Sequence, residues 1–65
     1  MAATRDDEPS GDVLYEVVTV GNAMRCAAIH ADTGVEVVVV GPAGGSEIAL
    51  KALAFRKLKA RLARE

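Results

Sequence analysis

The segment VLYEVVTVGNAMRCAAIHADTGVEVVVV, residues 13–40, decides the fold of this chain. Its first eight residues are dense in β-branched side chains, which favour a strand. Gly21-Asn22 follows. A two-residue loop that begins with glycine suits a type II′ hairpin turn, because glycine readily takes a positive φ. We therefore predict a strand over residues 13–20 and a hairpin that continues over 23–31.

A second turn follows at Ala31-Asp-Thr-Gly34. It fits a four-residue hairpin loop built on a type I turn, with Gly34 in the left-handed conformation. Residues 35–40, Val-Glu-Val-Val-Val-Val, form the third predicted strand. The three strands make an antiparallel meander.

The two turns also set which side chains share a face of the sheet. We expect Val20 to pair with Ala23 at the first turn and His30 to pair with Val35 at the second. Both turns then assign the same side chains to each face of the sheet. One face, expected to be the core, then holds Val13, Tyr15, Val17, Thr19, Met24, Cys26, Ala28, Val35, Val37 and Val39.

The opposite face of the sheet is expected to meet solvent or a partner. It collects the charges of Glu16, Arg25 and Glu36, but it also carries six large aliphatic residues: Leu14, Val18, Val20, Ile29, Val38 and Val40. A contiguous exposed apolar surface usually marks an interface, and residues 35–40 would be a hazardous bare edge. We therefore predict association through the sheet, with a second copy of the chain or with another protein.

A helix is predicted from Ser46 onward. Ser46 is a good N-cap, and Glu47 suits the positive end of the helix dipole. Apolar residues recur every four positions and predict a stripe that packs on the core face: Leu50, Ala54, Leu58 and Leu62, widened by Ile48 and Phe55. The expected fold class is α+β, a βββα domain.

Charge is divided unevenly along the chain. Residues 46–65 carry six basic and two acidic side chains, a net charge of +4, whereas residues 1–45 carry two basic and seven acidic ones, a net charge of −5. The exposed cations of the helix are a candidate electrostatic contact: Arg56, Lys57, Lys59, Arg61 and Arg64. Clustered cations suffice for binding phosphates, but base readout needs more aromatic and amide groups than this chain has. These cations therefore either form a solvated polar face or bind nucleic acid or the ribosome weakly and without sequence specificity.

Length and composition restrict the class of protein. Residues 1–11 are expected to form a disordered acidic tail, and residues 12–65 a single domain. A core of this size supplies only ~3–5 kcal/mol. One cysteine and one histidine form neither a disulfide nor a zinc site, so oligomerisation is the expected source of extra stability. The first residues contain no apolar signal region and no segment is long enough for membrane insertion, so we expect a cytoplasmic protein.

No catalytic, cofactor-binding or metal-binding residues are expected. The loop from Gly41 to Ser46 lies where phosphate loops occur but lacks their lysine. Cys26 lies about 13 Å along the strand from His30, the only available base, which is too far for a nucleophile pair. We expect Cys26 in the core, Tyr15 and Phe55 packed there too, and His30 solvated at a strand end. No small-molecule substrate is evident.

The order of these landmarks resembles that of a known family: Gly21-Asn22, Ala28-Ile29, Thr33-Gly34-Val35-Glu36, Gly41-Pro42-Ala43 and Arg56-Lys57-Leu58. Over residues 13–64 the chain is similar to a family of small uncharacterised alphaproteobacterial proteins of unknown function. The resemblance implies a bacterial cytoplasmic setting and supplies no catalytic residues. The sequence thus favours a non-enzymatic interaction module that self-associates through its sheet and displays a cationic helix.

Overall fold

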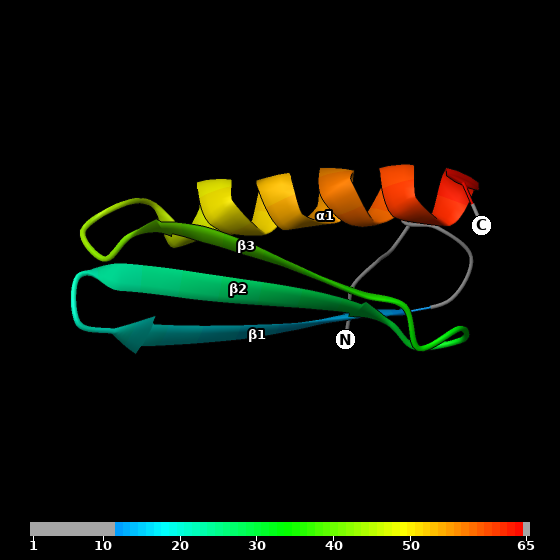
Figure 1. Cartoon of the computed structure of the whole chain (residues 1–65), viewed down its shortest axis with the longest axis horizontal. Helices are drawn as coiled ribbons and strands as arrows, with labels where there is room; N and C mark the ends of the chain where they lie inside the picture. Colours follow the sequence, from blue (N-terminus) through cyan, green and yellow to red (C-terminus); the bar gives the residue numbers. More distant parts are fainter. Residues whose placement is uncertain (1–11, 65) are drawn as a thin grey trace.

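The computed structural model describes residues 12–64, which form a three-stranded antiparallel sheet and one helix (Figure 1). The strands are β1 (Val13–Val20), β2 (Ala23–His30) and β3 (Glu36–Pro42), in the spatial order β1-β2-β3, and the helix is α1 (Glu47–Arg64). The predicted βββα fold is confirmed. The expected disordered tail, residues 1–11, lies outside the described residues, as does Glu65.

Both hairpin turns have the geometry that their glycines predict. Gly21 has φ +59° and Gly34 has φ +76°, a region that side chains with a Cβ avoid. Val20 pairs with Ala23, and Val17 lies opposite Cys26. The N–H of His30 donates to the Val35 carbonyl at 2.8 Å. The predicted register of the sheet is therefore confirmed at both turns.

The third strand extends further than predicted. β3 continues through Gly41 to Pro42, which pairs with Ala23, whereas the sequence placed the end of the strand at Val40. Proline is tolerated because β3 is an edge strand and its missing N–H would point away from β2. Ala43 then donates its N–H to the Asn22 carbonyl at 2.9 Å. The second strand is shorter than predicted by one residue.

The start of α1 is capped as predicted. Ser46 Oγ accepts a hydrogen bond from the Ala49 N–H at 3.0 Å, which satisfies one of the free amides of the first turn. Glu47 lies in that turn and forms an ion pair with Lys51, one turn later, at 3.3 Å. Neither α1 nor any other described segment is long and apolar enough to cross a bilayer as a helix.

The core lies between α1 and the two strands it packs on, β2 and β3. Its buried members come from all three elements: Met24, Cys26, Ala28, Val37, Val39, Leu50, Ala54 and Leu58. Leu58 is fully buried and its neighbours Arg56 and Lys57 are exposed, so the predicted orientation of the helix is confirmed.

Two residues assigned to the buried surface are exposed. Thr19 belongs to the predicted core face but lies near the end of β1, and α1 packs mainly on β2 and β3. Ile48 was expected to widen the apolar stripe, yet it is 81% exposed. At about 100° per residue, Ile48 is turned well away from Leu50, Ala54 and Leu58. Phe55, on the same side as Ile48, is half-buried.

Candidate functional site

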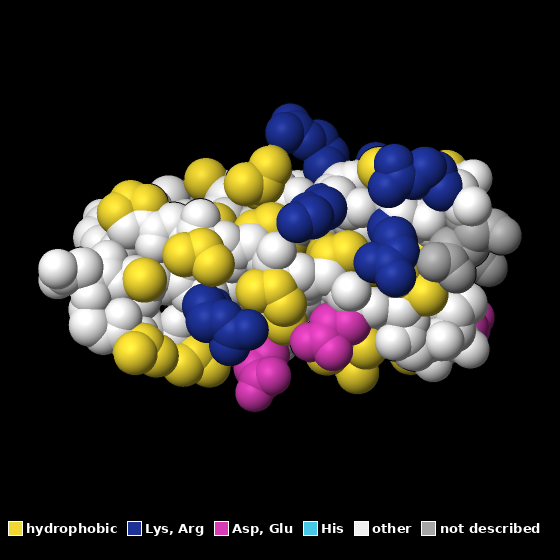
Figure 2. Space-filling model, in the orientation of Figure 1, with side chains coloured by type: hydrophobic (Ala, Val, Ile, Leu, Met, Phe, Trp, Pro, Cys, Tyr) yellow, Lys and Arg dark blue, Asp and Glu magenta, His cyan; other side chains and the backbone are white. Residues whose placement is uncertain are grey.

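The outer face of the sheet carries four of the six exposed large hydrophobic side chains in residues 12–64. Adjacent strands place Leu14 beside Ile29, Val38 beside Ala27, and both Val18 and Val40 beside Arg25. Hydrophobic side chains spread over the sheet with acidic groups among them, and Lys and Arg gather mainly over α1 (Figure 2). The most exposed aliphatic residues of this face are Leu14 (55%), Val18 (41%), Val20 (64%) and Val40 (60%).

The six residues of the predicted association face lie together on the outer face of the sheet, but their exposure is uneven. Ile29 and Val38 are only half-buried, and Ala27 between them is buried. Three of the four highly exposed aliphatic residues belong to β1. The exposed apolar surface is thus concentrated along one edge of the sheet, a bias that residue types alone do not reveal.

The cations of α1 do not form one patch. All five predicted contact residues are exposed, but Lys57, Arg61 and Arg64 follow the spacing i, i+4, i+7 and share one side of the helix. Arg56 lies opposite the buried stripe. Lys59 lies on a third side, with Nζ 4.9 Å from the centre of the Phe55 ring.

The side of α1 that carries Lys57 lies along the free edge of β3. Lys57 Nζ donates to the Val38 carbonyl at 3.3 Å. Val38 O points away from β2, so this contact joins the helix to a backbone group that the sheet leaves unpaired. The cation that the sequence assigned to partner binding also has a structural role.

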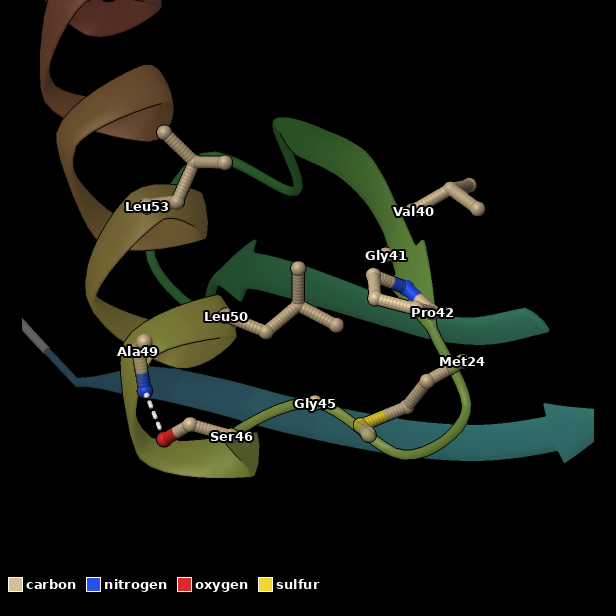
Figure 3. Close-up of a pocket in the computed structure, with 9 residues that line it drawn as sticks. All are labelled: Met24, Val40, Gly41, Pro42, Gly45, Ser46, Ala49, Leu50 and Leu53. Carbon is tan, nitrogen blue, oxygen red and sulfur yellow. Dashed lines mark hydrogen bonds between the residues drawn. The ribbon is translucent and has the colours of Figure 1, made fainter.

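A shallow apolar pocket of about 380 Å³ opens between the end of β3 and the first turns of α1 (Figure 3). Leu50 reaches from the helix toward Gly41, and a Cβ at Gly41 would lie 3.3 Å from Leu50 Cδ1. The full lining is Met24, Val40, Gly41, Pro42, Gly45, Ser46, Ala49, Leu50 and Leu53. Its one polar side chain, Ser46, already caps the helix. The sequence analysis did not predict this pocket. The one indication in the sequence was Leu53, a large apolar residue of the helix that lies outside the stripe expected to pack in the core.

Cys26 and His30 do not form a reactive pair. Cys26 is fully buried in the core, and burial raises the pKa of its thiol, which disfavours the thiolate. His30 was expected to be solvated, but it is only 5% exposed. As an even-numbered residue of β2 it points to the core side, and its Nδ1 lies 2.9 Å from Thr33 Oγ1. Within residues 12–64, no three His, Cys, Asp or Glu side chains are placed to hold a metal ion.

The sequence pattern of one protein family matches residues 10–65, so the chain belongs to the family described as Domain of unknown function (DUF6898). The match covers the whole βββα unit, including both turns and α1. Comparisons with curated proteins and with solved structures find no match.

Proposed function

We propose that this member of the family is a non-enzymatic protein-interaction module that self-associates through its sheet and presents the cations of α1 to solvent. The observation that carries the proposal is the outer sheet face, where four aliphatic side chains are more than 40% exposed and no described element covers them. The cytoplasm of an alphaproteobacterium, which the sequence resemblance implies, is part of the same proposal.

The energetics of a small domain support association. Burying apolar surface contributes ~25 cal/mol per Å², and a core of this size gives a margin of only ~3–5 kcal/mol. Pairing two copies through the sheet removes part of the exposed surface of Leu14, Val18 and Val20 from water. Part of this gain offsets the entropy lost on association, and the remainder stabilises the folded chain in proportion to its concentration.

A double substitution, Leu14→Lys with Val20→Lys, tests this proposal. Two lysines on the exposed face of β1 weaken any complex formed through the sheet, because the complex must desolvate their charges or bring like charges together. We therefore expect a more soluble, folded monomer. Size-exclusion chromatography with light scattering measures the mass. The matched control is Ile48→Lys, because Ile48 is exposed on α1 away from the sheet. A control that dissociates as readily as the double variant contradicts association through the sheet.

Nucleic-acid binding is a second candidate, favoured by the exposed row of Lys57, Arg61 and Arg64 along one side of α1. We expect any such binding to be weak, insensitive to sequence and steeply dependent on salt, because lysine and arginine contacts to phosphate release counterions. The chain offers one amide side chain, Asn22, for reading bases.

The double variant Arg61→Glu, Arg64→Glu should weaken this binding strongly. The slope of log affinity against log salt concentration should fall by the contribution of about two phosphate contacts. The control, Arg56→Glu with Lys59→Glu, changes the net charge equally but lies off the row, so it should weaken binding less. Fluorescence anisotropy with DNA and RNA of several sequences measures the affinity. Tight binding to one sequence motif at high salt contradicts a purely electrostatic contact.

A further inference from the structure

β1 is the least covered strand of the sheet. On the outer face it carries Leu14, Val18 and Val20, all highly exposed. On the inner face α1 packs on β2 and β3, so Thr19 is exposed and Val17 only half-buried. Both faces of this edge strand therefore retain surface that a neighbouring strand would cover.

The backbone of β1 is also oriented to accept another strand. Ala31 donates its N–H to the Asp12 carbonyl at 2.9 Å, and Val20 pairs with Ala23 across the two-residue turn. The even-numbered residues of β1 therefore bond to β2, and the odd-numbered ones point outward. Within residues 12–64, the outward N–H and C=O groups of Val17 and Thr19 meet no backbone partner.

The opposite edge of the sheet is protected. On β3 the outward groups belong to the even-numbered residues, and Lys57 already occupies the Val38 carbonyl. Pro42 has no N–H to offer. Lysine and proline on an edge are common devices against strand addition, and residues 13–20 contain neither. The two edges therefore differ, and within residues 12–64 no strand pairs with the outer edge of β1.

We propose that β1 pairs antiparallel with β1 of a second copy, which joins two domains into one six-stranded sheet. This inference rests on the proposed self-association and specifies its geometry. A two-fold axis perpendicular to the sheet keeps both helices on the same side and makes the contact self-complementary. The outer faces of the two sheets form one continuous face only when odd-numbered residues of one β1 lie opposite odd-numbered residues of the other.

The charge of Glu16 selects the register. A pairing centred on Glu16 places two like charges directly opposite, which is destabilising. A pairing centred on Val17 places Glu16 opposite Val18 of the second copy and Leu14 opposite Val20. In both registers seven residues of β1 lie opposite β1 of the second copy, so the length of the overlap is equal and the charge of Glu16 favours the pairing centred on Val17. In the Val17-centred sheet, Glu16 also lies two strands, about 10 Å, from Arg25 of the other copy, within reach of two extended side chains.

Proline substitutions at the two edges test the proposal. Thr19→Pro loses no backbone hydrogen bond to β2, but its ring lies where β1 of the second copy must pass. We therefore expect a loss of dimer affinity of about tenfold or more. Val40→Pro is the matched control, because Val40 is exposed and its N–H points out of the β3 edge. Sedimentation equilibrium of the full chain should show that this control still dimerises.

A third variant separates edge pairing from stacking of the outer faces. Val38→Lys lies on the outer face away from β1 and should leave an edge-paired dimer intact. A dimer that survives Thr19→Pro and is lost with Val38→Lys overturns edge pairing but supports association through the sheet. A wild-type chain that remains monomeric overturns both proposals. Amide exchange gives an independent check: the Val17 N–H should become protected as concentration rises, whereas the Val40 N–H should not.

Discussion

Replacing Leu58 with alanine is expected to unfold the domain. Leu58 is the largest fully buried side chain, at the centre of the contact between α1 and the sheet. Truncation of a buried leucine costs ~2–5 kcal/mol, because the transfer free energy is lost and a cavity remains. A core this small supplies only ~3–5 kcal/mol in total. Urea denaturation followed by circular dichroism measures the free energy of unfolding.

Leu53→Ala is the matched control for this prediction. Leu53 lies on the same helix but is 41% exposed and borders the open pocket, so its truncation removes less buried surface and should cost much less. If Leu58→Ala changes the free energy of unfolding by less than about 0.5 kcal/mol, the range of surface substitutions, the helix does not pack on the sheet through this side chain.

Replacing Cys26 with aspartate is expected to prevent folding at neutral pH. The side chain is fully buried between Val17 on β1 and Val39 on β3, which flank it in the sheet. The core cluster around Cys26 is apolar, and the effect of burial on this position outweighs the attraction of Lys51. Burying a poorly paired charge costs several kcal/mol, of the order of the whole stability margin. One-dimensional proton NMR would report the loss of dispersed methyl signals.

The control for this position is Cys26→Val, which keeps an apolar side chain of similar size and suits a strand. We expect it to fold and to associate like the natural chain. This outcome would assign Cys26 to packing, because a valine has no reactive atom. If the valine variant unfolds as completely as the aspartate variant, the sulfur has a role that packing does not supply.

The fold could be predicted because its turns are local. Gly21 and Gly34 each require a positive φ, and each fixes the register of a hairpin without knowledge of the rest of the chain. The error at Thr19 arose because burial there depends on an element distant in sequence, whereas the exposure of Ile48 follows from the helical repeat. Thr19 is exposed because α1 packs on β2 and β3, and the placement of a helix over a sheet is not encoded in the alternation of a strand.

His30 illustrates a different limit. The predicted register placed it on the core side, but its polarity and its position at a strand end favoured solvent. In the structure Thr33 Oγ1 lies 2.9 Å from its ring and also accepts the Val35 N–H at 3.2 Å, so the second turn supplies polar contacts for a buried imidazole. The burial of His30 is therefore accompanied by a polar contact to Thr33, three residues along the chain.

The association face could be predicted as a set of residues but not as a geometry. The alternation of the strands identified Leu14, Val18 and Val20 as outward-facing. The difference between the two edges of the sheet depends on Lys57 reaching the Val38 carbonyl, a contact between residues 19 positions apart. The sequence favoured the valine-rich third strand as the hazardous edge. In the structure Lys57 and Pro42 protect that edge, and among the described residues no strand pairs with the outer edge of β1.

The proposed association joins two copies of this chain through their sheets. Sedimentation equilibrium of the unmodified chain, over a series from low micromolar to several hundred micromolar, measures this association. We predict a concentration-dependent shift of the average mass from monomer to dimer that stops at the dimer, because a two-fold contact between β1 strands is closed. A mass that remains that of the monomer throughout the series would contradict association through the sheet.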